Sequence, residues 1–272
     1  MKTNIYEFFE QTAKDNNNKT AVIEDGKSWS FSQLEKDCHG IARKILNNSP
    51  QNNSIVGVFL KKSYALIASD LAITASGNAY MNMDYKGPPE RLRAILNNVN
   101  PEMIITDSDG ANLLEALSEQ NLPQLIIINS LNEKSLDDSF AHHLREHRSN
   151  VIDTDPYCLI NTSGSTGIPK SVILNHRSFV DFINWSVYEF NFNGSEIMGS
   201  LSPSIFDIFS FELCLLSFEA ATICLIDDKL APFPAKILDI LEDQKINFIF
   251  WVPTIMVNIA NLGLLDKFSL SN

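Results

Sequence analysis

The feature that most constrains this chain is a regular alternation of short apolar runs with segments of helical periodicity. The runs, rich in β-branched and aromatic residues, are TAVIED, SIVGVFL, AYMNMD, EMIITD, QLIIIN, YCLINTS, ATICLID and NFIFWV. Parallel strands need long crossover connections, which helices usually supply. The alternation therefore predicts an α/β fold of layered, parallel-type sheets covered by helices.

Two helices are indicated by local patterns. Ser32 stands at capping-box spacing from Glu35, directly after WSF, and is expected to open the first helix. The apolar face of that helix would comprise Leu34, Cys38, Ile41, Ala42 and Ile45. The second helix is predicted for PERLRAILNN, which starts with proline and places Leu92, Ile95 and Leu96 inward.

Composition narrows the function classes. The 272 residues suffice for one large α/β domain or two ordinary ones. With 21 Lys and Arg against 33 Asp and Glu, the net charge of −12 argues against a nucleic acid as partner, because phosphate backbones are bound by clustered basic residues. The start of the chain has no signal-peptide pattern and no stretch is apolar enough to span a membrane, which predicts a cytoplasmic protein.

Cysteines and histidines do not indicate a metal site. The four cysteines, Cys38, Cys158, Cys214 and Cys224, are far apart and form no Cys-x-x-Cys pair, which is typical of reduced core residues. Three of the five histidines lie in the charged segment AHHLREHRSN, which is most simply a solvated helix face. No metal-binding residue is predicted.

A polar segment divides the chain. Residues 130–154 are rich in polar side chains and lose clear periodicity, so they are expected to form a surface excursion. It would separate a first α/β portion, residues 1–129, from a second, residues 155–272.

The stretch DPYCLINTSGSTGIPKSVILNHRSF, residues 155–179, carries the clearest chemistry. An apolar run leads into Thr162, Ser163, Gly164, Ser165, Thr166 and Gly167, and Lys170 follows after Ile168 and Pro169. Backbone N–H groups and hydroxyls in such a loop suit phosphate oxygens, the glycines permit close approach, and Lys170 adds a positive charge. We call residues 162–170 the phosphate loop. The alternative is a plain Ser/Gly-rich surface linker.

The phosphate loop differs from the Walker pattern. Pro169 precedes Lys170, and the VIL run after Ser171 predicts a strand where a Walker loop would open a helix. A generic doubly wound nucleotide-binding protein, in which the glycine-rich loop leads into a helix, is therefore disfavoured.

The loop resembles a motif of the adenylate-forming enzymes, a superfamily of amino-acid adenylation domains of the nonribosomal peptide synthetase type, D-alanine:carrier-protein ligases, acyl-CoA synthetases and luciferases. NTSGSTGIPKS is similar to Thr-Ser-Gly-(Ser/Thr)-Thr-Gly-x-Pro-Lys-Gly at every position except the last, where Ser171 stands. WSFSQL and SGNAYMNMD resemble two further family segments in the right order, with Asn82 where proline is usual. The resemblance implies the N-terminal portion of the family's large subdomain, without the small C-terminal domain.

A fourth segment, SPSIFDIFSFELC, bears on the substrate. In the amino-acid-activating branch, an aromatic–aspartate pair opens a helix here and the aspartate pairs with the substrate's ammonium group; Phe206 and Asp207 fit that pair. A carboxylate beside a partly buried ammonium distinguishes an amino acid from a plain carboxylic acid, because an unpaired acid is costly to desolvate. The alternative is that Asp207 merely caps the helix.

By the same resemblance, Ile208, Phe211 and Phe250 line the side-chain pocket, although each could equally be an ordinary core residue. One isoleucine and two phenylalanines would leave little volume. A small amino acid is therefore expected, alanine first, and the D-alanine:carrier-protein ligases are the nearest subgroup. The residues leave the stereochemistry open.

The resemblance also implies a reaction. An amino-acid carboxylate attacks the α-phosphate of Mg²⁺·ATP, which gives an aminoacyl adenylate and releases pyrophosphate. The acyl group then passes to the phosphopantetheine thiol of an acyl or peptidyl carrier protein. The family's adenine-contacting segment, ribose-binding aspartate and catalytic lysine lie beyond Asn272. No catalytic residue is therefore predicted within these 272 residues, and the chain alone is expected to be inactive.

Two other functions stay open. An acyl- or aryl-CoA ligase shares the phosphate loop but usually lacks an aspartate at the place of Asp207. A non-catalytic remnant that binds a nucleotide or a partner protein is the alternative from a different class.

Overall fold

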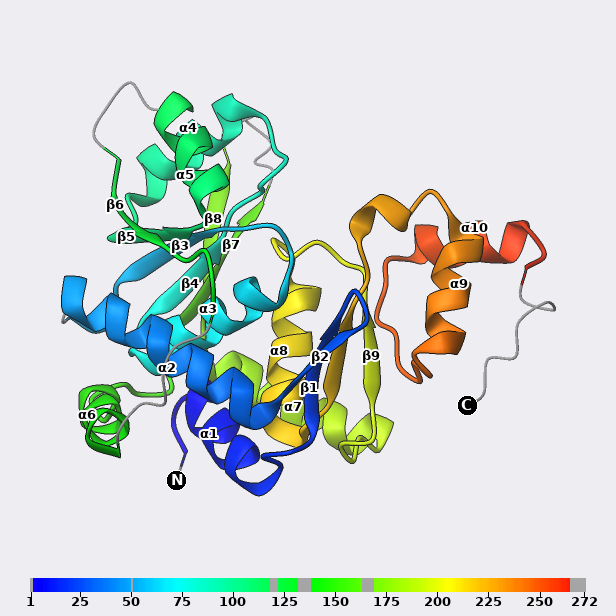
Figure 1. Cartoon of the computed structure of the whole chain (residues 1–272), viewed down its shortest axis with the longest axis horizontal. Helices are drawn as coiled ribbons and strands as arrows, with labels where there is room; N and C mark the ends of the chain where they lie inside the picture. Colours follow the sequence, from blue (N-terminus) through cyan, green and yellow to red (C-terminus); the bar gives the residue numbers. More distant parts are fainter. Residues whose placement is uncertain (1, 50, 118–121, 132–137, 163–168, 265–272) are drawn as a thin grey trace.

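A six-stranded sheet forms one half of the computed structural model, which describes residues 2–49, 51–117, 122–131, 138–162 and 169–264 (Figure 1). Its strand order is β6-β5-β3-β4-β7-β8. The strands are β3 (Ile55–Phe59), β4 (Ala79–Asn82), β5 (Met103–Thr106), β6 (Gln124–Ile127), β7 (Pro156–Thr162) and β8 (Lys170–Asn175). All neighbours pair in parallel except β7 and β8, which form an antiparallel hairpin.

A four-stranded sheet, in the order β2-β1-β10-β9, forms the other half. Its strands are β1 (Thr20–Glu24), β2 (Lys27–Ser30), β9 (Ile197–Ser200) and β10 (Thr222–Leu225). β10 pairs in parallel with β1 and β9, and β2 pairs antiparallel with β1. The six-stranded sheet thus contains strands from both sides of residues 130–154, whereas the four-stranded sheet joins the start of the chain to its last third.

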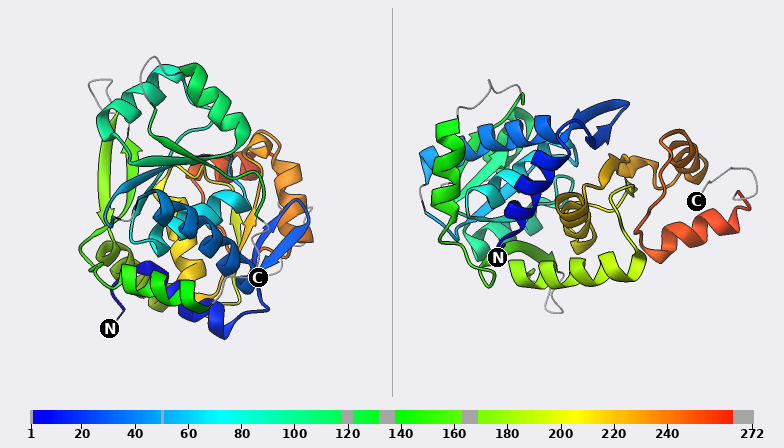
Figure 2. Two further views of the ribbon diagram at one scale, coloured as in Figure 1. Left: turned by 60° about the vertical axis from the view of Figure 1, so that its left-hand side comes forward. Right: turned by 90° about the horizontal axis from the view of Figure 1, so that it is seen from below.

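Helices separate and cover the sheets (Figures 1 and 2). They are α1 (Ile5–Asp15), α2 (Phe31–Asn48), α3 (Tyr64–Ala75), α4 (Pro89–Val99), α5 (Ser108–Leu117), α6 (Asp138–Arg148), α7 (His176–Phe190), α8 (Asp207–Glu219), α9 (Pro234–Asp243) and α10 (Pro253–Asn261), with the 3-10 turn η1 (Asp228–Leu230). α3 is buried along its whole length and α8 along most of its length, and both lie between the sheets. α4 and α5 cover the outer face of the six-stranded sheet, and α9 covers the outer face of the other. The layered α/β fold expected from the sequence is confirmed.

The capping prediction for α2 is wrong by two residues. Ser30, the last residue of β2, is the N-cap, and its side chain accepts a hydrogen bond from the Gln33 amide. An N-cap needs an extended backbone, which Ser30 has, whereas Ser32 lies inside the helix. The predicted apolar face is buried throughout.

The strand predicted for NFIFWV is also wrong. Beside β9 the segment forms a single bridge, Met198 to Phe248, and the chain then turns into α10 at Pro253. The apolar side chains are used in packing instead: Trp251 is buried and its indole Nε1 donates to the Gly199 carbonyl at 2.6 Å. Within the described residues, no helix combines the length and apolar character needed to cross a bilayer.

Residues 130–154 include the helix α6, which lies at the margin of the molecule (Figure 1). An ion pair joins α6 to α1, because Arg148 contacts Glu10 of α1 at 3.2 Å. Leu144 of α6 is buried. The sequence-based division at residues 129 and 154 stays a prediction. All four cysteines are buried as free thiols.

Candidate functional site

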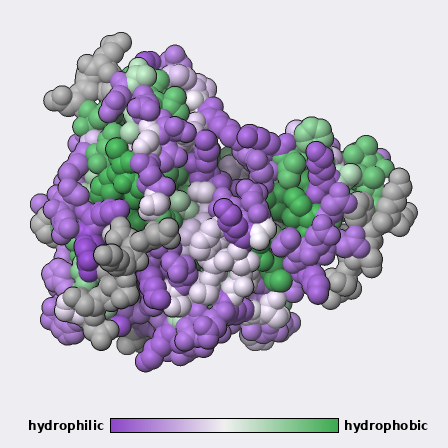
Figure 3. All heavy atoms as spheres, in the orientation of Figure 1, coloured by the Kyte–Doolittle hydropathy of each residue, from purple (hydrophilic) through white to green (hydrophobic). Residues whose placement is uncertain are grey.

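A pocket of about 620 Å³ lies at the carboxyl ends of the parallel strands of both sheets. This edge is where open α/β sheets usually bind ligands. Its lining comes from the segments after β1, β3, β4, β5, β6 and β10, and from Pro203, Ser204 and Ile205 before α8. Figure 3 shows the surface hollowed between the lobe of α4 and α5 and the lobe of α9 and α10.

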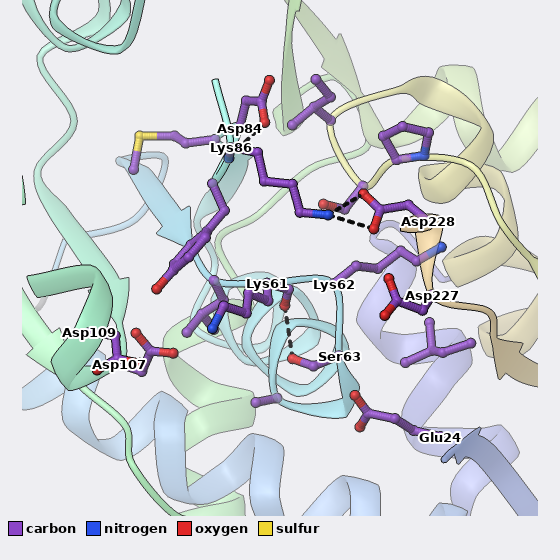
Figure 4. Close-up of a pocket in the computed structure, with 18 of the residues that line it drawn as sticks. Glu24, Lys61, Lys62, Ser63, Asp84, Lys86, Asp107, Asp109, Asp227 and Asp228 are labelled. Atoms are coloured by element: carbon purple, nitrogen blue, oxygen red, sulfur yellow. Dashed lines mark hydrogen bonds and ion pairs between the residues drawn. The ribbon is translucent and has the colours of Figure 1, made fainter. Parts of the chain in front are cut away.

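The lining of the pocket is strongly charged, with more acids than lysines (Figure 4). The acids are Glu24, Asp25, Asp84, Asp107, Asp109, Asp227 and Asp228, and the lysines are Lys61, Lys62, Lys86 and Lys229. Lys86, after β4, reaches across to both carboxylate oxygens of Asp228 at 2.6 and 2.8 Å. This ion pair links the edge of one sheet to that of the other.

Lys62 joins the two sheets at the pocket wall. Its Nζ donates to the carbonyls of Ser200 at 2.7 Å and Ser202 at 3.3 Å. Burial lowers the pKa of Lys62 to about 8, with Glu212 of α8 opposing the shift, and burial raises the pKa of Glu212 to about 7. Lys62 therefore fixes the start of the segment between β9 and α8, residues 201–206, which we call the substrate loop.

Two predicted phosphate-loop residues are brought together by the β7–β8 hairpin. Thr162 ends β7 and Lys170 begins β8, the two are paired in the ladder, and Thr162 Oγ1 donates to the Lys170 carbonyl at 3.3 Å. The other predicted residues, Ser163 to Gly167, lie outside the described part of the chain. Because β7 runs parallel to β4, the phosphate loop leaves the sheet at the edge where the pocket lies.

Phe206 and Asp207 lie at the start of α8, the N-cap being Phe206 and the first helical residue Asp207. Both side chains are exposed, and Asp207 Oδ1 accepts a hydrogen bond from the Ile208 amide at 3.0 Å. Asp207 is not the N-cap, so helix capping does not explain why an aspartate stands at this position. Its negative charge in the first turn does interact favourably with the helix dipole.

The three predicted side-chain-pocket residues differ in exposure. Phe211 and Phe250 are in contact, with ring centroids 5.4 Å apart in an edge-to-face arrangement. Phe211 is 3% exposed and Phe250 is 41% exposed, while Ile208 is half-buried. Asp207 and Phe211 are one helical turn apart and so share a face of α8. The carboxylate therefore stands at one end of a short aromatic wall.

Three further aromatic residues near Phe211 belong to no motif that the sequence analysis identified. Phe182, Phe192 and Phe248 surround Phe211, with ring centroids 5.5, 6.5 and 6.3 Å from its ring. The sequence analysis also did not predict the charged residues of the pocket. Their positions in the sequence could have identified them, because many directly follow a predicted strand, and the carboxyl ends of parallel strands meet at one edge of a sheet.

The described ends of the phosphate loop carry two groups of the kind that bind phosphate oxygens. They are the Thr162 hydroxyl and the amino group of Lys170, and both residues are exposed. Among the residues whose positions are described, no three His, Cys, Asp or Glu side chains are grouped as metal ligands would be.

Known proteins similar to this chain include synthetases and synthases. Over 254 residues it is 29% identical to bacitracin synthase 1 of Bacillus licheniformis, covering 92% of this chain and 4% of that protein. It is 25% identical over 267 residues to malpinin synthetase of Mortierella alpina, covering 97% and 3%, and 21% identical over 258 residues to zwittermicin A synthase ZmaJ of Bacillus cereus, covering 94% and 47%. The chain thus spans less than half the length of each of these relatives.

Solved structures share the fold. The nonribosomal peptide synthetase FmoA3 bound to α-methyl-L-serine-AMP superposes with a TM-score of 0.81 at 18% identity, covering 95% of this chain and 28% of that one. The N-terminal subdomain of Klebsiella oxytoca NpsA, in complex with 3-hydroxybenzoyl-AMSN, gives 0.78 at 16% identity, covering 97% and 63%. The family model described as AMP-binding enzyme matches residues 9–271. With nearly its whole length matched, the chain belongs to the AMP-binding enzyme family.

Proposed function

We propose that this chain supplies the phosphate loop and the substrate site of an adenylation domain. The domain would activate a small amino acid, alanine first, as aminoacyl-AMP and pass it to the phosphopantetheine thiol of a carrier protein. Membership of the AMP-binding enzyme family and similarity to peptide synthetases support the proposal. Because the chain spans only part of its relatives, the activity is proposed for the full-length protein that contains residues 1–272.

The observation that carries the proposal is the arrangement of Asp207, Phe211 and Phe250. An exposed carboxylate at the first turn of α8 stands one turn from an edge-to-face aromatic pair. An amino acid has the complementary layout, with an ammonium group beside its side chain. The crowding of aromatic rings around Phe211 favours a small side chain, since larger ones would need one ring to move.

The phosphate loop would hold ATP, which supplies the α-phosphate for activation and a pyrophosphate leaving group. Ser163, Ser165 and Thr166 would donate hydroxyl hydrogen bonds to the β- and γ-phosphates, and Lys170 would offset their charge. Thr162, whose hydroxyl donates to the Lys170 carbonyl, would hold the base of the loop. Mg²⁺ would arrive with the nucleotide, and a divalent cation would lessen repulsion between the phosphates and the acidic pocket. The residues' task in this step is to position and to stabilise charge.

The test is ATP–pyrophosphate exchange by the full-length protein with a panel of amino acids. Glycine, alanine and serine are expected to support exchange, and phenylalanine and leucine to fail. Asp207→Asn should lower kcat/KM for the amino acid by at least ~100-fold, because a charge-assisted contact is lost from a desolvated ammonium. Asp181→Asn, an exposed aspartate on α7, is the matched control and should have no effect. Unchanged exchange with Asp207→Asn would contradict the assignment.

A second candidate is activation of an aryl acid. NpsA, one of the structural neighbours, is described in complex with an aryl-acyl adenylate analogue, and the exposed rings of Phe206 and Phe250 could stack on such a group. Exchange driven by benzoate derivatives and unaffected by Asp207→Asn would favour this reading.

A further inference from the structure

The substrate loop is held by side chains that come from the other sheet. Lys62, just beyond β3, donates to the carbonyls of Ser200 and Ser202. Asn82, the last residue of β4, donates through Nδ2 to the Ser204 carbonyl at 3.2 Å. Residues 201–206 thus lie against the carboxyl ends of β3 and β4, immediately before Phe206 and Asp207.

β4 contacts the segment on both sides of Asp207. Alternate residues of a strand face the same way, so Tyr80 and Asn82 share one face of β4. The Tyr80 hydroxyl and Ser210 Oγ of α8 are 2.8 Å apart, and Asn82 binds the carbonyl of Ser204. Both β4 side chains are almost fully buried. One strand therefore anchors the chain three residues before and three residues after Asp207.

Asn82 is oriented in turn by Asp70 of α3. Asn82 Nδ2 donates to Asp70 Oδ2 at 2.8 Å, so its two amide protons serve Asp70 and Ser204. Asp70 is 1% exposed, and burial raises its pKa well above the usual range of a carboxyl group. The remaining oxygens, Asp70 Oδ1 and Asn82 Oδ1, are buried without a partner among the described residues. A proton kept on Asp70 supplies a donor for this acid–amide pair.

We propose that Asn82, oriented by Asp70, is a positioning residue that sets where Phe206 and Asp207 stand. Asn82 holds the substrate loop whatever the loop binds, and its effect on the substrate rests on the proposed function. Proline, which is usual here in the family that the sequence resembles, has no side-chain donor. In this chain a directional hydrogen bond to Ser204 therefore fixes the substrate loop.

Hydrogen exchange read by mass spectrometry on the 272-residue chain tests the anchoring. Asn82→Ala is expected to speed exchange about tenfold in peptides that cover residues 200–210. Asn78→Ala is the matched control: Asn78 is equally buried, precedes β4 at its other end and binds Ser54 and Ser76 instead. It should leave those peptides unchanged. Asp70→Asn keeps an oxygen that accepts from Asn82, so exchange in these peptides should be no faster than in the original chain.

Exchange in residues 200–210 that is unchanged by Asn82→Ala, or raised equally by Asn78→Ala, would overturn the proposal. If Asn82→Ala does not fold, Asn82→Ser serves, since its short hydroxyl cannot bridge Asp70 and Ser204. The same variants in the full-length protein test the consequence. Asn82→Ala should raise the KM for the amino acid about tenfold and leave that for ATP within twofold.

The two proposals fail in different ways. If the unaltered full-length protein activates no amino acid, the proposed function fails, and the exchange experiment still decides whether Asn82 anchors the loop. If Asn82→Ala loosens residues 200–210 and the amino-acid KM does not change, Asn82 anchors the loop without positioning the substrate site, and the inference is overturned.

Discussion

The two loops that carry the proposed chemistry are fixed in opposite ways. The phosphate loop is closed at its base by Thr162 and Lys170, neighbours in a hairpin and only eight residues apart. The substrate loop is held by Lys62 and Asn82, which are 122 to 140 residues away from the carbonyls they bind. A motif can specify the first loop by itself. The geometry of the second exists only when both sheets are assembled.

The largest effect on stability is expected where a distant tether is cut. Lys62→Met leaves the Ser200 and Ser202 carbonyls without this donor and removes the cation near the buried Glu212. We expect a loss of about 2–3 kcal/mol in the free energy of unfolding, measured by urea denaturation. Lys61→Met is the matched control, because Lys61 is exposed over the Tyr85 ring, and should cost less than about 1 kcal/mol. Equal losses would show that the tether contributes nothing.

Removing the charge beside the phosphate loop should act on ATP and not on folding. Lys170→Ala in the full-length protein is expected to raise the KM for ATP in pyrophosphate exchange at least ~10-fold, since a charged contact to phosphate is lost. Stability should change by less than about 0.5 kcal/mol, because Lys170 is exposed. Lys27→Ala, at the exposed first residue of β2, is the control, and an equal change in KM there would contradict a specific role for Lys170.

The pairing of Asp70 with Asn82 makes the contact between Asn82 and the substrate loop sensitive to pH. Because burial holds the pKa of Asp70 well above its usual range in the folded chain, the Asp70 contribution to the free energy of unfolding should fall as pH rises from about 4. The buried His39 and His176, whose pKa values burial lowers to about 4, contribute in the opposite direction. Asp70→Asn removes this contribution, so the variant should match the original chain near pH 4 and be more stable than it at pH 8. Cys38, Tyr80 and Cys158 face Asp70, and burial raises the pKa of each, so they do not titrate in this window. A stability difference independent of pH would contradict a protonated Asp70.

The smallest effect is expected at the exit of the phosphate loop. Ser171 Oγ donates to Asn161 Oδ1 at 2.7 Å across the hairpin. Ser171→Ala should cost about 0.5–1 kcal/mol in urea denaturation through loss of one half-buried hydrogen bond. Ser171→Gly, which introduces the glycine usual in the resembled family, should cost about 0.5–1 kcal/mol more, through backbone entropy. A larger loss than that of Lys62→Met would reverse the comparison between the loops.

Sequence patterns predicted most of the fold but not its exceptions. Apolar runs identified most strands because buried parallel strands are continuous in hydrophobicity. NFIFWV has the same composition, yet it makes only one bridge to β9, since Pro253 turns the chain into α10. The N-cap of α2 was misplaced because Ser30 and Ser32 both fit a cap, and only the extended backbone of Ser30 distinguishes them.

The sequence by itself determined the α/β class, the phosphate-loop hairpin ends and the position of Asp207 at the opening of a helix. Each of these depends on residues that are close together in the chain. The tertiary structure alone decided that Asn82 and Lys62 reach the substrate loop, that Asp70 is buried with an amide as its partner, and that charged strand ends from two sheets line one pocket. Those contacts join segments more than a hundred residues apart or depend on the burial of a side chain. Local periodicity of the sequence predicts neither long-range contacts nor the burial of a single polar side chain.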